Sequence, residues 1–287
     1  MARRRTARAR LSAFVLAVAA VASVATAQLD GRAADAAPTA PEQPAELAAM
    51  RAGNTTSLSP ATRVSPPERR VLMVGDSTLA AVRNVTASQA LFVGFEPVLD
   101  AQGCRRLVWP SCFSDSDFRT PNTVEEAILT TPGEVDVVVV MSGYNDWHDP
   151  FGSFVDTIMT AARSKGATQV VWLTLSVGRQ PKTSATAMGV YAENTQMLWD
   201  SAPRHPDLVV ADWRSYNQRA VGWMTRDGVH LETRGAFGLA DYLSRWIAHL
   251  DGRACTAPLD PGGVPQYPCP SPNSMTRVPD ISGLYGI

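Results

Sequence analysis

The 287-residue sequence has few of the residues that bind metals, with only four cysteines and four histidines. No Cys-x-x-Cys pair occurs and the histidines do not cluster with the cysteines, so the usual spacing of a zinc site is missing. A glycine-rich phosphate loop, a dinucleotide-binding fingerprint and internal repeats are absent too. Gly-x-Ser-x-Gly is also missing, which argues against the ordinary α/β-hydrolase fold. The sequence therefore predicts neither a metal nor a cofactor.

An excess of basic charge is found only at the amino end. The first ten residues contain five arginines and no acid, and residues 11–27 form an uncharged apolar run that ends in Ala-Thr-Ala. This pattern is typical of a secretory signal peptide cut before Gln28, with a retained membrane anchor as the alternative. Cleavage would leave 21 basic against 27 acidic side chains, a net charge near −6. We expect a secreted or extracytoplasmic protein, with association with the cell envelope as a variant of this prediction. A negative net charge does not favour binding to nucleic acid, so we expect none.

The four cysteines fit an exported protein with two disulfides. Three pairings are possible, and we favour Cys104 with Cys112 and Cys255 with Cys269, because each pair closes a short loop. Pairing in an oxidising compartment would leave little free thiolate, so Cys104 is not expected to be a nucleophile.

The chain divides into an organised middle and two irregular ends. Residues 28–68 predict a flexible Pro- and Ala-rich linker, and residues 251–287 a Pro- and Gly-rich tail held by a disulfide. Within 69–250, apolar runs of strand length alternate with helical patterns. The predicted strands are 70–75, 95–101, 135–143, 169–175 and 207–213, and the predicted helices are 78–91, 122–130, 152–164, 187–201 and 235–249. Because the strands are apolar on both faces, we expect a parallel sheet covered by helices on each side.

Polar residues follow the predicted strands, where reactive groups gather in parallel sheets. Gly75-Asp76-Ser77 comes directly after the first strand. Ser77 is either a helix N-cap or a nucleophile, and Asp76 is expected to be the structural residue of the pair. A nucleophilic serine needs a base and a group that orients the base, which His230 and Asp227 could supply from one loop.

An oxyanion that forms on a reacting ester needs hydrogen-bond donors fixed in advance. Gly103 follows the second strand and Asn145 the third. We expect the backbone N–H groups of Ser77 and Gly103 and the side-chain amide of Asn145 to be these donors. Glycine at position 103 would let the backbone approach a substrate closely.

In this order the blocks GDS, AQG, GYND and DGVH resemble those of the SGNH hydrolase superfamily, the GDSL-type esterases and lipases. The family is named after Ser, Gly, Asn and His, here Ser77, Gly103, Asn145 and His230. The resemblance covers roughly residues 70–250 and implies a flavodoxin-like three-layer α/β/α sandwich with a five-stranded parallel sheet. It also implies ester hydrolysis through an acyl-enzyme on Ser77, with Asp227 orienting His230. The first block reads GDST, so the subfamily stays open.

The compartment favours an acylated glycan or lipid as substrate, and no long apolar lid segment is visible to shelter a fatty chain. We therefore expect a secreted serine esterase acting on short, acetyl-type esters. Two alternatives remain. One is an O-acyltransferase that uses the same triad on cell-envelope sugars, and the other is a non-catalytic envelope-binding protein.

For other residues near these blocks, the sequence gives weaker evidence of a part in substrate binding. Arg105 and Arg106 are expected in a solvated loop, with an anionic substrate group as the alternative partner, and His205 is expected at the surface. Tyr144 and Trp147 flank the candidate amide donor and either line a substrate pocket or pack over the sheet edge. His148 is expected at the pocket rim or in solvent. The candidates for the substrate pocket are Tyr144, Trp147 and His148.

Overall fold

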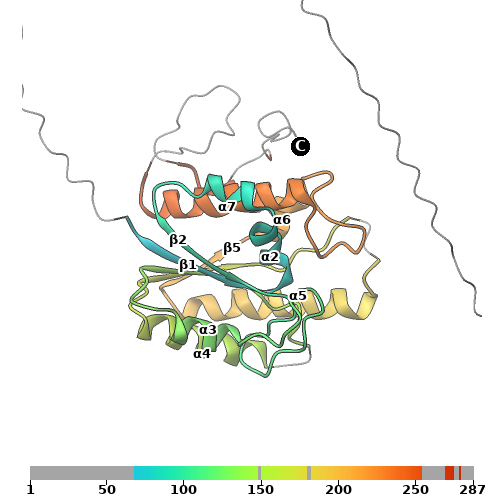
Figure 1. Cartoon of the computed structure of the whole chain (residues 1–287), viewed down its shortest axis with the longest axis horizontal. Coiled ribbons are helices and arrows are strands. Elements are labelled where there is room, and N and C mark those ends of the chain that lie inside the picture. The colour runs from blue at the N-terminus through green and yellow to red at the C-terminus, as the bar shows by residue number, and fades with distance from the viewer. Residues whose placement is uncertain (1–67, 148–149, 180–181, 254–268, 275–277, 279–287) are drawn as a thin grey trace, which may run out of the picture. The chain divides into compact units, whose positions relative to one another are not determined.

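The computed structural model describes residues 68–147, 150–179, 182–253, 269–274 and 278 (Figure 1). The predicted signal peptide (1–27), nearly all of the linker (28–68) and most of the tail (251–287) lie outside the described residues. So do His148 and Cys255, and with Cys255 its predicted pairing to Cys269.

Five parallel strands form one sheet in the order β2-β1-β3-β4-β5. Their bounds are β1 (Arg70–Gly75), β2 (Glu96–Ala101), β3 (Val137–Met141), β4 (Gln169–Leu173) and β5 (Leu208–Ala211). Gly75 pairs with Ala101 on one side and with Met141 on the other, so the carboxyl ends of the three strands are level. This strand order is that of flavodoxin-like sandwiches, in which ligands bind where the order reverses, between β1 and β3. The predicted five-stranded parallel sheet is confirmed.

Helices cover both faces of the sheet (Figure 1). One layer contains α2, α6 and α7, and the other contains α3, α4 and α5. The bounds are α2 (Ser77–Asn84), η1 (Thr86–Leu91), α3 (Val124–Thr130), α4 (Phe151–Ser164), α5 (Ala185–Ser201), η2 (Ala202–Arg204), α6 (Trp213–Asn217), α7 (Thr233–Leu250) and η3 (Pro272–Ser274). None of the helices in the described part of the chain is both long and apolar enough to cross a membrane.

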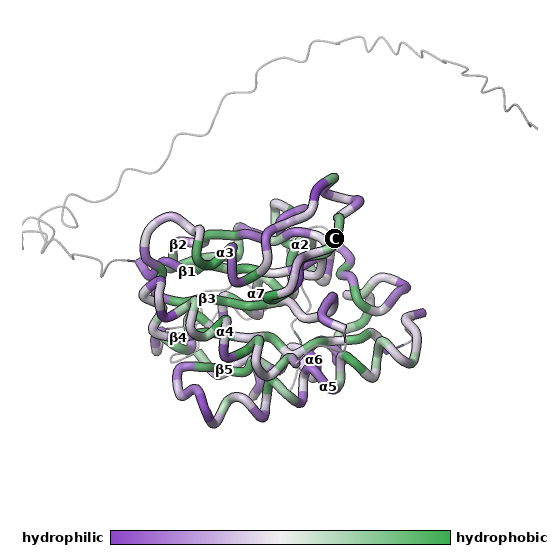
Figure 2. The backbone as a smooth tube through the Cα atoms, turned by 90° about the horizontal axis from the view of Figure 1, so that it is seen from below, coloured by the Kyte–Doolittle hydropathy of each residue, from purple (hydrophilic) through white to green (hydrophobic). Residues whose placement is uncertain are grey.

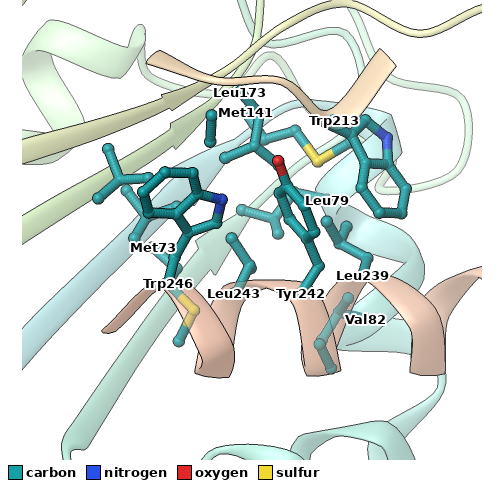
Figure 3. Packing of buried hydrophobic residues seen from close by; sticks show 14 of the residues in the cluster. Met73, Leu79, Val82, Met141, Leu173, Trp213, Leu239, Tyr242, Leu243 and Trp246 are labelled. Carbon is teal, nitrogen blue, oxygen red and sulfur yellow. The ribbon is translucent and has the colours of Figure 1, made fainter. Parts of the chain in front are cut away.

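The alternation of side chains along the strands divides the buried residues between two cores. Met73 and Val139 pack toward α2 and α7, and their neighbours Val74 and Val140 pack toward α3 and α4. Figure 2 shows the hydrophobic colour along β3, which is buried at every position. Figure 3 shows the first core, where Tyr242 and other side chains of α7 lie against Met73 and the strands. Burial on both faces explains why the strands lack polar alternation.

Three local predictions were wrong. The expected helix 78–91 is two segments, because the chain leaves helical geometry at Val85 (ψ 73°) before η1. The fifth strand ends at Ala211, since the Asp212 carboxylate accepts from the Ser215 N–H at 3.1 Å and caps α6. His205 is buried rather than at the surface, because its ring bonds to side chains of α4.

Candidate active site

The turn from β1 into α2 positions Ser77 at the switch point of the sheet. A Cβ on Gly75 would collide with the carbonyl oxygen of Met141, so only glycine lets β1 lie this close to β3. Asp76 caps α2 as predicted, its Oδ1 accepting from the Thr78 N–H (2.9 Å) and hydroxyl (2.7 Å). Because Asp76 does the capping, the hydroxyl of Ser77 is available for another contact.

That contact comes from the loop between α6 and α7. Ser77 Oγ lies 2.9 Å from His230 Nε2, and His230 Nδ1 lies 2.7 Å from Asp227 Oδ2. The structure therefore brings the three predicted residues together in one hydrogen-bonded chain, although they lie up to 153 positions apart. An ionised carboxylate can only accept, so Nδ1 donates to Asp227, and in a neutral imidazole Nε2 would then accept from the serine hydroxyl.

Asp227 uses its two oxygens differently. Oδ1 accepts from the Thr225 hydroxyl (2.6 Å) and from the N–H groups of Val229 (2.8 Å) and His230 (3.0 Å), which holds the loop in shape. Oδ2 is left for the imidazole. Partial burial acts to raise the pKa of Asp227, but the hydrogen bonds from Thr225, His230 and the backbone outweigh it and hold this pKa well below its usual range. The carboxylate therefore stays ionised at neutral pH and below.

The predicted oxyanion donors are less open than expected. The Gly103 N–H donates to Asp117 Oδ2 at 2.7 Å, so a substrate oxygen could reach it only after that carboxylate moves. A Cβ on Gly103 would collide with the Ser114 hydroxyl, so glycine here makes room for the chain's own loop. The Asn145 side chain donates one N–H to the Arg105 carbonyl at 3.1 Å, and its amide has a second N–H.

Asp117 was missed by the sequence analysis. Its Oδ1 accepts from Arg83 on α2 at 2.7 Å, and Arg83 also donates to the Ala101 carbonyl at 2.6 Å. Burial acts to raise the pKa of Asp117, but the Gly103 N–H and Arg83 outweigh it and lower this pKa. The helix that begins with Ser77 is thereby tied to the loop that carries Gly103. Nothing in the local sequence marks this contact, which depends on the folded path of the loop.

The loop after β2 is further fixed by a disulfide and by a buried arginine. Cys104 and Cys112 form the predicted disulfide, with their Cα atoms 5.3 Å apart. Arg105 is fully buried, so the expectation of a solvated loop was wrong for this residue. Its guanidinium donates to the Asp100 carboxylate (2.9 Å) and carbonyl (2.6 Å) and to the Asn122 carbonyl (3.0 Å). These bonds satisfy the buried charge within the protein.

The side chains next to Asn145 divide between packing and exposure. Tyr144 is buried, and its hydroxyl both donates to the Ser176 carbonyl (2.7 Å) and accepts from the Ser176 N–H (2.6 Å). Burial, and then the charge of Asp76, raise the pKa of Tyr144, so the phenol stays neutral. Of the two roles expected for Tyr144, lining a pocket or packing, its burial agrees with packing. Trp147 is 40% exposed, and its ring meets Tyr191 edge-on at 6.2 Å.

Among the residues that the structure describes, no three His, Cys, Asp or Glu side chains gather as metal ligands would. The candidate site is a hydroxyl, an imidazole and a carboxylate in line at the carboxyl end of β1, and Gly103 and Asn145 follow the two neighbouring strands. Such a site can activate the serine oxygen for attack on a carbonyl carbon.

Comparison with known proteins gives likenesses of fold. No protein-family model matches the chain, and no curated protein matches its sequence. Solved structures do match. The catalytic domain of a peptidoglycan O-acetyltransferase from Streptococcus pneumoniae is 18% identical, with 61% of this chain and 90% of that one covered and a TM-score of 0.44.

Two acetylesterase structures match to a similar extent. A variant acetyl xylan esterase from Geobacillus stearothermophilus is 12% identical (TM-score 0.45), with 62% of this chain and 92% of that one covered. A carbohydrate acetylesterase from Sinorhizobium meliloti is 16% identical (TM-score 0.46), with 64% and 100% covered. At these identities and scores the likeness concerns the α/β fold, and the chemistry has to be inferred from the side chains of the site.

Proposed function

We propose that the protein is a serine esterase of the SGNH type that hydrolyses its substrate through an acyl-enzyme on Ser77. The observation that carries this proposal is the hydrogen-bonded chain from Ser77 through His230 to Asp227 at the carboxyl end of β1. A helix-capping role alone would not require an imidazole on the serine hydroxyl, and here Asp76 provides the cap.

The reaction follows from the positions of these atoms. His230 Nε2 takes the proton of Ser77 as Oγ attacks the ester carbonyl, and Asp227 stabilises the imidazolium that forms. The Ser77 N–H at the start of α2 and the second N–H of Asn145 stabilise the oxyanion, joined by the Gly103 N–H once Asp117 turns away. The alcohol leaves with the proton held by His230. Water then repeats the sequence on the acyl-enzyme and releases the acid.

The exposure of the site favours an ester carried on a bulky molecule. The side chains of His230 and Asp227 are 47% and 45% exposed, so an acyl group that projects from a polymer or a membrane surface can reach Ser77. We propose short acyl esters, acetyl above all, of a glycan or lipid as substrates. The Cys104–Cys112 disulfide supports an extracytoplasmic location, and we propose residues 1–27 as the signal peptide.

An open site also admits acceptors other than water. An O-acyltransferase would use the same first half-reaction and pass the acyl group to a sugar hydroxyl. Product analysis with and without a sugar acceptor separates the two activities. Acylated sugar as the main product would replace the hydrolase proposal by the transferase.

The decisive test is the hydrolysis of p-nitrophenyl acetate by the wild type and by Ser77→Ala. We expect kcat/KM to fall by about 10³-fold or more in Ser77→Ala and His230→Ala. His249→Ala, which changes an exposed histidine at the end of α7, is the matched control and should keep wild-type activity. Equal rates in the wild type and Ser77→Ala would contradict the proposal.

A further inference from the structure

A cavity of about 490 Å³ lies beside the candidate active site. Its walls come from the loop after β4, from α5 and from the region of α6, and they include Leu175, Arg179, Met188, Tyr191, Arg214 and Gln218. The volume lies within the range of small-molecule binding sites. Apolar side chains form part of the lining, and its charged residues are Arg179 and Arg214, both exposed to solvent.

The charge of this cavity is one-sided. None of its described lining residues is acidic, although the sequence as a whole has more acidic than basic side chains. Arg179 donates through Nε to the Gln218 carbonyl at 2.9 Å, which fixes the base of the guanidinium and leaves its terminal nitrogens for another partner. Arg214 uses its backbone N–H on Thr174 (2.9 Å), and its guanidinium has no ion-pair or hydrogen-bond partner among the described residues.

The cavity shares a wall with the catalytic loop. Gly178, directly before Arg179, donates its N–H to the Gly228 carbonyl at 2.6 Å, and Gly228 follows Asp227. The Thr183 hydroxyl donates to the Asp227 carbonyl at 2.6 Å. On the other side, Tyr191 packs against Tyr144, with ring centroids 4.9 Å apart, next to Asn145. The cavity therefore lies next to the loop that carries Asp227 and His230.

A cavity lined by two arginines and by no described Asp or Glu favours an anionic ligand. Arginine binds carboxylate and phosphate oxygens through paired, charge-assisted hydrogen bonds, which neutral hydroxyls of a sugar cannot replace. We propose that this cavity is a subsite for a carboxylate or phosphate group of the acylated substrate. The substrate is then an acidic glycan or a phosphate-bearing glycan rather than a neutral one. This inference rests on the proposed esterase activity of Ser77.

The test compares three acetyl esters that share a sugar ring and the acetylated hydroxyl: O-acetylglucose, O-acetylglucuronate and O-acetylglucose 6-phosphate. The readout is the ratio of kcat/KM for each anionic ester to that for the neutral one, which cancels general effects on the chemistry. We expect a ratio of about 10 to 100 in the wild type. In Arg179→Gln/Arg214→Gln the ratio should fall close to one. If the wild-type ratio is larger for O-acetylglucuronate, the ligand of the subsite is a carboxylate. If it is larger for O-acetylglucose 6-phosphate, the ligand is a phosphate.

The matched control removes the same charge elsewhere. Arg163→Gln/Arg204→Gln changes two partly exposed arginines that precede β4 and β5, at the opposite ends of the strands from Ser77, and should keep the wild-type ratio. A ratio near one in the wild type, or an equal fall in both double variants, overturns the subsite. The same preparations are also tested for hydrolysis of p-nitrophenyl acetate. If the wild type hydrolyses it and Ser77→Ala does not, the esterase proposal holds even when the subsite proposal fails.

Discussion

Replacing Asp227 by asparagine would separate the two tasks of this carboxylate. The amide oxygen of Asn can keep the three bonds that Oδ1 accepts from Thr225, Val229 and His230, so the loop should keep its shape. The amide nitrogen would then face His230 Nδ1, where the wild type has an acceptor at 2.7 Å. An N–H in this place forces Nδ1 to accept and puts the proton on Nε2. The imidazole could no longer take the proton of Ser77.

The expected loss is large and confined to the chemistry. Wrong-tautomer variants of this kind lose about 10⁴-fold in kcat, which corresponds to roughly 5 kcal/mol of transition-state stabilisation. We expect the Asn variant to show this loss in p-nitrophenyl acetate hydrolysis while its Tm stays close to that of the wild type. Asp227→Ala, which also removes the bonds of Oδ1, should lose activity and melt at a lower temperature. An Asn variant that keeps more than a tenth of wild-type kcat would refute the orienting role of Asp227.

Three further outcomes are expected. Asp117→Ala should raise kcat/KM by about 10-fold, because the Gly103 N–H no longer has to leave a charged partner; an unchanged kcat/KM in a variant with the wild-type Tm would mean that this amide is not a donor. On acidification, log(kcat/KM) should fall with a slope no steeper than one, since Asp227, whose pKa lies below its usual range, stays ionised and takes up no second proton. A slope near two would mean that Asp227 is protonated as well. Arg105→Met should cost roughly 3 kcal/mol and lower the Tm by about 6–12 °C, because two carbonyls and a carboxylate lose their buried donor; an unchanged Tm would contradict this.

The sheet and the candidate site could be predicted because their signals are local. Each strand is a short apolar run, and β3 is buried at all five positions, so its assignment did not depend on distant contacts. Ser77, Gly103 and Asn145 each follow a strand, and parallel topology brings strand ends to one edge. Knowledge of the chain order was then enough to expect these residues near one another.

The errors lie where burial depends on a distant partner. Arg105 is adjacent to two residues of the loop after β2 that are partly exposed, and only the fold places Asp100 and Asn122 around its guanidinium. His205 is buried because Asp156, 49 positions away, lies 2.7 Å from its ring. Composition and periodicity contain no information about such pairs, since either residue alone is typical of a surface.

The same reasoning explains how this site can keep its reactive groups available. A serine at a helix start usually spends its hydroxyl on capping, but Asp76 accepts the Thr78 N–H instead. An aspartate in a turn usually binds backbone amides, and Asp227 does so with one oxygen, which leaves the other for the imidazole. At both positions a carboxylate meets the structural demand of the backbone. The hydroxyl of Ser77 and the imidazole of His230 are therefore left to interact with each other, which is the arrangement that nucleophilic catalysis requires.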